Sequence, residues 1–276
     1  MEKIIIKTPA KINFGLNILR KRSDGYHDIE TIFYPIKLFD TLTISPSKKF
    51  TFKSNLKQIA DEQNNSIIKA VKLLEKLSGK KFNINIELEK LIPIGAGMGG
   101  GSSDGAASLI ALNKYYNLNI AEDELKKLAL KIGSDTPFFL NPTPSFAQSR
   151  GEIIQNINFS IPFAILIVNP GIHISTKWAY ENLKLKNHND FLRSINSNVQ
   201  LDFSRLKNKV TNDFEDIVYE KYQEIKKIKL QLYKSKALFA LMTGSGSTVF
   251  GIFQDYNSAK IAAEKFPSNY FTFIDY

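Results

Sequence analysis

Residues 92–105 read Ile-Pro-Ile-Gly-Ala-Gly-Met-Gly-Gly-Gly-Ser-Ser-Asp-Gly, and the fold can be worked out from this glycine-rich stretch. Apolar and polar residues alternate over 82–88 before it, which predicts a strand, and a helix pattern follows it as far as about Tyr116. A loop that leads into a helix aims free backbone N–H groups and the positive end of the helix dipole at one point, and glycines leave that point unobstructed. The stretch therefore predicts a phosphate site. The plainer alternative is a flexible loop, which the well-patterned elements on both sides disfavour.

Three classes of phosphate-binding protein have motifs of this kind, and none of them fits the surroundings. A dinucleotide fingerprint starting at Gly95 requires a strand that ends in an acidic residue about 20 positions later. The residues there, 121–124, read Ala-Glu-Asp-Glu and begin another helix. A Walker A loop requires a lysine where Gly101 stands. A protein kinase requires the tripeptides His-Arg-Asp and Asp-Phe-Gly, and the chain contains neither.

A serine hydrolase stays open as an alternative. The residues around Ser103 read Gly-x-Ser-x-Gly, as in a nucleophile elbow, and Asp135 with His173 or His188 follows in the order that such a triad needs. The glycines before Ser103 weaken this alternative, because they predict a loop rather than the tip of a strand.

Composition narrows the possible classes further. The chain has 276 residues, of which 43% are hydrophobic and 12% aromatic, so it can bury real cores. It contains no cysteine and three histidines, which excludes thiol chemistry and disulfides and offers little for a metal centre, so no metal ligands are expected. The first residues lack the pattern of a signal peptide, and no apolar run is long enough to span a membrane. We therefore expect a cytoplasmic protein without a membrane partner.

The charge balance favours anionic partners without identifying them. Lysine and arginine number 37 against 27 acidic residues, which gives a net charge of +10. These cations are spread along the whole chain, so we expect no nucleic-acid partner. An RNA-binding module remains a third alternative, supported by the positive charge alone.

The order of patterned segments predicts an α+β protein. Strand patterns dominate the first fifty residues, and helix and strand patterns mix afterwards, so we expect two domains, at 1–150 and 151–276. The predicted strands are 2–7, 11–19, 29–36, 41–45, 82–88, 163–168, 238–242, 249–253 and 270–274. The predicted helices are 65–77, about 102–116, 121–132, 175–183, 213–234 and 258–266.

Three segments in order resemble the motifs of the GHMP kinases. They read Pro-Ala-Lys-Ile-Asn at 9–13, Pro-x-Gly-Ala-Gly-x-Gly-Gly-Gly-Ser-Ser at 93–103 and Thr-Gly-Ser-Gly-Ser at 243–247. The turn at 22–27, Arg-Ser-Asp-Gly-Tyr-His, resembles family members that act on a cytidine diphosphate derivative of methylerythritol, in the non-mevalonate route to isoprenoids. The resemblance implies a two-domain fold with an ATP-binding and a substrate-binding domain around a central cleft. It also implies phosphorylation of the substrate's tertiary 2-hydroxyl by ATP, with Mg²⁺ carried mainly by ATP.

The resemblance also assigns roles to individual residues. The catalytic pair would be Lys11 and Asp135, although from the residues alone a surface lysine and a helix N-cap are the simpler interpretations. The residues that would bind ATP are Asn65, Lys90, Pro93, Ile94, Gly95, Ala96, Gly97, Met98, Gly99, Gly100, Gly101, Ser102 and Ser103, with Ser103 as the hydroxyl nearest Mg²⁺. The residues that would bind the second substrate are Asn13, Tyr26, His27, Thr176, Tyr180, Gly244, Ser245 and Gly246.

Overall fold

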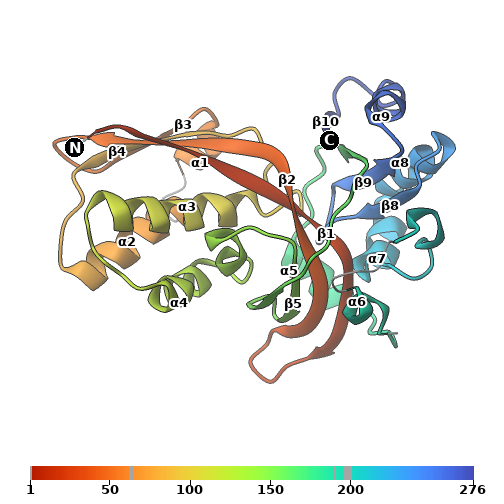
Figure 1. The fold of residues 1–276 in the computed structure, drawn as a ribbon, viewed down its shortest axis with the longest axis horizontal. Helices are drawn as coiled ribbons and strands as arrows, with labels where there is room; N and C mark the ends of the chain where they lie inside the picture. Colours follow the sequence, from red (N-terminus) through yellow and green to blue (C-terminus); the bar gives the residue numbers. More distant parts are fainter. Residues whose placement is uncertain (1, 62–64, 189, 196–200) are drawn as a thin grey trace. The chain divides into compact units, whose positions relative to one another are not determined.

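The chain folds into two compact units that are interleaved along the sequence. The computed structural model describes residues 2–61, 65–188, 190–195 and 201–276 (Figure 1). Unit 1 comprises Met1–Ala10, Lys37–Ile92 and Gly99–Pro142, and unit 2 comprises Lys11–Ile36, Pro93–Met98 and Thr143–Tyr276. The last passage between the units, after Pro142, falls near the expected domain boundary at residue 150, which itself stays a prediction. Residues 189 and 196–200, in a segment rich in asparagine and lysine that runs from 184 to 209, lie outside the described residues.

Two long strands contribute residues to both units. They are β1 (Ile4–Lys21) and β2 (His27–Pro46). The sequence patterns predict four separate strands here, and that prediction is wrong in its number. The predicted breaks at 8–10 and 37–40 do not occur, because the backbone stays extended through both segments. The predicted turn at 23–25 is confirmed between the two strands.

Unit 1 is a sheet with three helices packed on one face. Within it the strand order is β3-β4-β2, with β3 and β4 parallel and β4 and β2 antiparallel, and Thr41 pairs with Glu89. Figure 1 shows α2, α3 and α4 on the same side of this sheet. The elements are β3 (Thr51–Ser54), α1 (Lys57–Ala60), α2 (Ser66–Ser78), β4 (Ile84–Glu89), α3 (Gly100–Tyr115), α4 (Glu122–Ile132) and the 3-10 helix η1 (Thr136–Leu140).

Local chemistry sets the ends of the helix before the glycine stretch. Asn65 caps α2, because its side-chain oxygen accepts a hydrogen bond from the Ile68 N–H at 2.9 Å. Gly79 ends the helix in the left-handed conformation with φ of 67°. Ile67, Val71 and Leu74 recur at helical spacing and are buried in the core of unit 1. The predicted helix at 65–77 is thereby confirmed.

Unit 2 is built around an antiparallel sheet with the strand order β10-β7-β9-β8. Its core joins apolar side chains of this sheet to those of α5, α7, α8 and α9. A second sheet segment in the unit pairs β2 with β5 and β5 with β6. The elements are β5 (Ser145–Ser149), β6 (Ile153–Asn156), β7 (Ala164–Asn169), α5 (Thr176–Asn182), α6 (Phe191–Ser194), the 3-10 helix η2 (Phe203–Arg205), α7 (Phe214–Lys221), α8 (Gln223–Lys234), β8 (Phe239–Met242), β9 (Val249–Phe253), α9 (Tyr256–Ala263) and β10 (Phe271–Asp275).

One predicted helix of unit 2 is divided in two. The pattern at 213–234 predicts a continuous helix, but Tyr222 leaves the helical region, with φ of −123° and ψ of 75°, between α7 and α8. Its ring packs edge-to-face on Trp178, with centroids 5.9 Å apart, and tertiary packing rather than a glycine or proline accompanies the break. The predicted hairpin around 244–247 is confirmed by the antiparallel pairing of β8 and β9.

No helix among the described residues is both long enough and apolar enough to cross a lipid bilayer.

Candidate active site

The glycine stretch has the backbone that its composition predicts. Gly95, Gly97 and Gly99 have φ of 63°, 76° and 71°, a region that residues with a β-carbon rarely adopt. In unit 2, a β-carbon built on Gly97 would lie only 2.2 Å from the carbonyl oxygen of Thr243. Glycine is therefore required at this position both for its conformation and for a close approach of two backbones.

The second half of the stretch begins α3 in unit 1. Gly99 is the N-cap, and the first intrahelical bond runs from the Ser103 N–H to the Gly99 carbonyl at 2.9 Å. The N–H groups of the residues before Ser103 have no acceptor within the helix, so they are available to an anion. This geometry supports the predicted phosphate site.

Lys11 is a buried residue rather than the surface lysine that its strand position suggests. It is 3% exposed on β1, in unit 2, and its Nζ donates to Asn13 Oδ1 and to the Gly97 carbonyl, the latter at 3.3 Å. The ammonium also lies 5.0 Å from the centre of the Phe33 ring. The Lys11 N–H donates to the Met98 carbonyl at 3.0 Å. Lys11 is thus tied to the first half of the glycine stretch by both its backbone and its side chain.

Asn13 holds Lys11 in place. Its Nδ2 donates to Thr31 Oγ1 at 2.9 Å, and its backbone N–H donates to Thr243 Oγ1 at 2.8 Å. Thr243 Oγ1 in turn donates to the Gly97 carbonyl at 3.2 Å. The amide predicted to contact substrate is therefore already engaged with protein groups, and its visible effect is to orient the Lys11 ammonium.

Asp135 lies in unit 1, in the turn between α4 and η1. It occupies the N-cap position of η1 but makes no side-chain capping bond, so the simple helix-cap interpretation does not account for it. A β-carbon built on Gly133, in the same turn, would lie 3.7 Å from the hydroxyl oxygen of Ser102. The turn that carries Asp135 is therefore packed beside the first turn of α3.

Lys90 belongs to a buried ion cluster in unit 1. Its Nζ donates to Asp40 Oδ2 and, at 3.1 Å, to Asp104 Oδ2. Burial raises the pKa of Asp104 to about 6, and the neighbouring carboxylate of Asp40 adds to this effect while Lys90 opposes it. The sequence does not predict this ion cluster, because Asp40 and Asp104 are isolated acidic residues that belong to no recognisable pattern. A role for Lys90 and Asn65 near the adenosine of ATP stays a prediction.

The aromatic residues predicted to bind substrate, Tyr26, His27 and Tyr180, all lie in unit 2. The His27 ring stacks on Tyr180, with centroids 4.6 Å apart and an interplanar angle of 17°. Tyr26 is 48% exposed, and the Arg150 guanidinium lies 4.3 Å from its ring centre. Burial lowers the pKa of His27, and the positive charge of Lys21 lowers it further. The lower pKa favours the neutral imidazole, which has one donor and one acceptor nitrogen.

Two polar contacts of unit 2 connect the remaining predicted substrate residues. Thr176 Oγ1 and Ser245 Oγ lie 3.0 Å apart, which joins the start of α5 to the turn that contains Gly244 and Gly246. His173, considered in the sequence only as a hydrolase residue, packs on the glycine stretch, because a β-carbon built on Gly95 would lie 2.7 Å from its Nδ1. Neither Arg150 nor His173 stands in a motif that indicates these positions.

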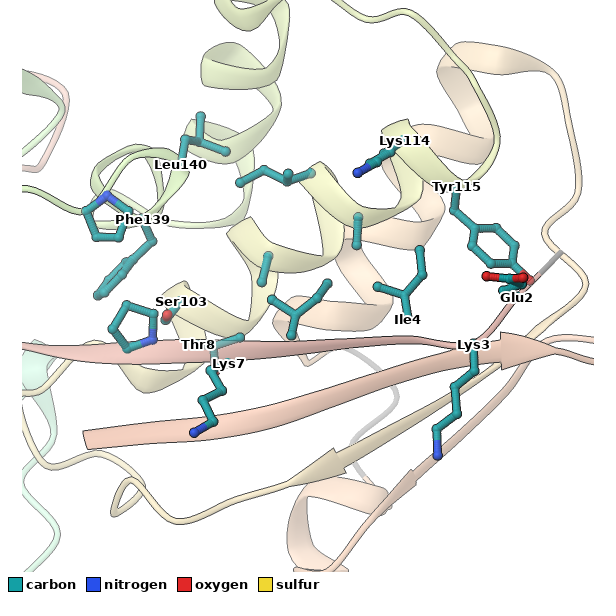
Figure 2. Close-up of a pocket in the computed structure, with 16 residues that line it drawn as sticks. Glu2, Lys3, Ile4, Lys7, Thr8, Ser103, Lys114, Tyr115, Phe139 and Leu140 are labelled. Atoms are coloured by element: carbon teal, nitrogen blue, oxygen red, sulfur yellow. The ribbon is translucent and has the colours of Figure 1, made fainter. Parts of the chain in front are cut away.

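A pocket of about 640 Å³ lies beside α3 in unit 1, lined by the start of β1, by α3 and by the η1 region. Figure 2 shows Ser103 near Thr8 and Phe139 at one end of this pocket, and Tyr115 with Glu2 at the other. The Ser103 hydroxyl is buried and has no hydrogen-bond partner among the described residues. A nucleophilic serine needs a base within hydrogen-bond distance, so this hydroxyl does not have the surroundings of a hydrolase nucleophile.

A metal site built from protein side chains alone is not found in the described part of the chain, where no group of three or more histidine and acidic residues is suitably placed.

Comparison with known proteins agrees with these features. Residues 65–141 match the family model of the GHMP kinases N terminal domain, and residues 179–272 match that of the GHMP kinases C terminal domain. A protein of Prosthecochloris aestuarii named 4-diphosphocytidyl-2-C-methyl-D-erythritol kinase is 38% identical over 274 residues, which cover 98% of this chain and 96% of that protein. A protein of the same name from Thermodesulfovibrio yellowstonii is 39% identical over 267 residues, covering 94% and 93%.

Solved structures show the same fold. A crystal structure of 4-(cytidine 5'-diphospho)-2C-methyl-D-erythritol kinase superposes with a TM-score of 0.82 at 28% identity, covering 99% of this chain and 98% of that one. A homoserine kinase from Cytophaga hutchinsonii, 14% identical, has a TM-score of 0.77 over 100% of this chain and 95% of that one, and so shares the fold. The GHMP kinase resemblance carried by the three motifs and the predicted α+β fold are thereby confirmed, and kinase activity is favoured over a serine hydrolase or an RNA-binding module. The chain belongs to the 4-diphosphocytidyl-2-C-methyl-D-erythritol kinase family of the GHMP kinases.

Proposed function

We propose that the chain transfers the γ-phosphoryl group of ATP to the 2-hydroxyl of 4-(cytidine 5'-diphospho)-2-C-methyl-D-erythritol, giving the 2-phosphate and ADP, in the non-mevalonate route to isopentenyl diphosphate. The observation that carries the proposal is the buried Lys11 ammonium, fixed against the glycine stretch of a chain whose full-length relatives bear this kinase name. Both substrates are water-soluble anions, which suits a cytoplasmic enzyme. The net charge of +10 favours their capture.

The glycine stretch from Pro93 to Ser103 binds the ATP phosphates in this proposal. The positive φ values of its glycines and the unpaired N–H groups at the start of α3 suit a polyphosphate. Mg²⁺ carried by ATP would neutralise charge on the phosphates and would take oxygen ligands. The Ser103 hydroxyl suits such a ligand chemically, because it is a buried oxygen without a hydrogen-bond partner among the described residues.

Lys11 and Asp135 have different catalytic roles in this proposal. The 2-hydroxyl oxygen attacks the γ-phosphorus, the bond from that phosphorus to the β–γ bridging oxygen breaks, and ADP leaves. The transition state of such a transfer is loose, so little base strength is needed and most of the barrier is lowered by positioning and charge neutralisation. Lys11 stabilises the negative charge of the transferring group, while Asp135 orients the hydroxyl and receives its proton late.

Tyr26, His27 and Tyr180 bind the cytidine half of the substrate in this proposal. Tyr26 offers an exposed ring face for stacking, and the neutral His27 matches an acceptor and a donor on the cytosine edge. Thr176 and Ser245 lie at the diphosphate region of the substrate in this proposal, and Asn13 toward its methylerythritol part.

A coupled ADP-release assay tests the proposed reaction. The cytidyl substrate is expected to drive ADP release, whereas mevalonate and homoserine leave it at the background rate. Equal turnover of mevalonate or homoserine would contradict the proposed substrate. Labelling of Ser103 by a fluorophosphonate probe would instead favour the hydrolase alternative.

Removal of the Tyr26 ring should weaken binding of the cytidyl substrate. Stacking on an aromatic ring is worth about 1–3 kcal/mol per base, so Tyr26→Ala is expected to raise the KM for this substrate roughly 5- to 150-fold and to leave the KM for ATP unchanged. Tyr256→Ala is the matched control, because Tyr256 is a similarly exposed tyrosine, at 41% against 48%. An unchanged KM in Tyr26→Ala would remove Tyr26 from the site.

The proposed role of Asp135 predicts different effects for two substitutions. Asp135→Asn keeps a group that can hold the hydroxyl, so kcat should fall by about 10- to 100-fold, at or below the lower end of full general-base catalysis. Asp135→Ala removes the positioning as well and should cost more. Initial rates at saturating ATP and cytidyl substrate measure kcat for both variants, with Asp123→Asn on α4 as control, since that carboxylate is 91% exposed. A loss of about 10⁴-fold in Asp135→Asn would show that Asp135 acts as a full base.

A further inference from the structure

A buried network in unit 1 connects both ends of the glycine stretch. On the entry side, Asp40 Oδ1 accepts the backbone N–H groups of Leu91 at 2.6 Å and Ile92 at 2.8 Å, immediately before Pro93. On the exit side, Lys90 Nζ donates to Asp104 Oδ2 at 3.1 Å, in the second turn of α3. Lys90 also donates to Asp40. One ion cluster therefore fixes the backbone where the stretch begins and the helix where it ends.

The cluster is packed against the first turn of α3 without reaching solvent. A β-carbon built on Gly100 would lie 2.6 Å from Lys90 Nζ, so the ammonium occupies the space beside the first helical residue. The exposed fractions of the side chains are 4% for Lys90, 0% for Asp40 and 3% for Asp104. Since these side chains are buried and paired with one another, they are placed to affect ATP through the backbone that they hold.

A fourth residue, Thr8 of β1, completes the network. Its Oγ1 donates to Asp104 Oδ1 at 2.7 Å, and Thr8 itself is 0% exposed. Figure 2 shows Thr8 on β1 at the same end of the pocket as Ser103 of α3. Each Asp104 oxygen thus has its own donor, Thr8 on one side and Lys90 on the other.

Burying two carboxylates and one ammonium is costly, and well-packed apolar residues in their place are often equally stable. The cluster is therefore better explained by the way it fixes the backbone at both ends of the glycine stretch than by a contribution to stability alone. We propose that Asp40, Lys90 and Asp104, with Thr8, are positioning residues that hold the first turn of α3 in the geometry that binds ATP. This inference rests on the proposed function in assigning the site to ATP.

The Thr8 hydroxyl offers a clean test, because two small substitutions separate its hydrogen bond from its packing. Thr8→Val keeps the shape and removes the donor to Asp104, and Thr8→Ser keeps the donor and removes a methyl group. Thr8→Val is expected to raise the KM for ATP severalfold and Thr8→Ser to keep the wild-type value. A residue that acted only through packing would show the opposite order.

Asp104→Asn tests the cluster more strongly, because it removes the charge that faces Lys90 and keeps the size of the side chain. The KM for ATP is expected to rise about tenfold, because a small displacement of a binding group has an effect of this size. The KM for the cytidyl substrate should be unchanged, and kcat should stay within about threefold of the wild-type value. In the Asp104→Asn background, Thr8→Val should have little further effect, because both act through the same carboxyl group. Asp213→Asn, the same change at a buried aspartate of unit 2, should leave the KM for ATP unchanged.

Hydrogen–deuterium exchange gives a readout that is independent of turnover. Asp104→Asn and Thr8→Val should speed amide exchange in the peptide that covers 99–104 and leave α8 unaffected. Wild-type KM and wild-type exchange in both variants would overturn the proposal. A parallel rise in both KM values with a lower Tm would overturn it as well, because it would show a purely structural role.

Nucleotide binding without turnover separates this inference from the proposed function. The Kd of a fluorescent ADP analogue should rise in Asp104→Asn by the same factor as the KM for ATP. If the wild-type chain binds this probe but does not phosphorylate the cytidyl substrate, the proposed reaction is wrong, and the effect of Asp104→Asn on Kd still decides the role of the cluster.

Discussion

Lys11→Met is expected to lower kcat by about 10³-fold or more, the loss typical when a positioned cation no longer stabilises a transferring phosphoryl group. Methionine has nearly the length of lysine and fills the same buried space, so the change removes the charge and leaves the packing. The KM values should change much less than kcat, because the charge acts mainly on the transition state. Initial rates at saturating ATP and cytidyl substrate measure the effect.

The same strand provides the control. Lys7 of β1 is exposed, and its ammonium lies 5.7 Å from the centre of the Phe39 ring, so Lys7→Met removes a cation that has no proposed role. Its kcat should equal that of the wild type. The Tm of Lys11→Met should not fall greatly, since a buried charge is replaced by an apolar chain. A Lys11→Met variant that keeps more than about a tenth of the wild-type kcat would contradict the electrostatic role.

The burial of Lys11 could not be predicted from the residues around it in the sequence. A lysine in an alternating strand pattern indicates a surface residue, because charged side chains are rarely buried without partners. The partners of Lys11 are Asn13, two residues away, and the Gly97 carbonyl, 86 residues away. The family resemblance predicted a role for Lys11, but the physical reason for its burial is a contact between distant segments that no local pattern encodes.

The parts of the fold that could be predicted depend on local sequence signals, and the parts that could not depend on contacts between distant segments. The helix at 66–78 was predictable because its cap, its apolar spacing and its C-terminal glycine are all local. The short strands β5 and β6 were not predicted, because β5 reads Ser-Phe-Ala-Gln-Ser and is extended through its pairing with β2. The division of the 213–234 helix at Tyr222 likewise accompanies contacts in the core of unit 2.

In the glycine stretch, one feature is predictable from the local sequence and another depends on a contact with a distant segment. Five glycines in seven residues predict an unusual backbone, and the positive φ values agree. The sequence does not reveal which glycine is indispensable for packing, because that depends on the turn at 243–246, which approaches Gly97 from 146 residues away. The structure singles out Gly97, and a substitution there should have one of the largest effects in the chain.

Gly97→Ala is expected to lower kcat/KM for ATP by more than about 10²-fold, because a displacement of about 1 Å at a binding loop already costs that much. The alanine β-carbon would lie 2.2 Å from the Thr243 carbonyl oxygen, a backbone atom that cannot rotate away, so the loop or the turn at 243–246 must shift. Such a shift also displaces the Gly97 carbonyl, which accepts a hydrogen bond from the Lys11 ammonium. Binding of ATP and placement of the catalytic cation should therefore be damaged together.

The cost of the positive φ alone must be separated from the cost of the clash, and Gly171→Ala does this. Gly171 has φ of 75°, against 76° for Gly97, but a β-carbon built on it would meet nothing within 4 Å. Gly171→Ala should therefore show only the conformational cost of about 1–2 kcal/mol, seen as a lower Tm with kcat/KM preserved. Gly97→Ala should show a further loss of Tm and the kinetic defect. Equal behaviour of the two variants would mean that backbone conformation, rather than the close approach to Thr243, is what requires glycine at position 97.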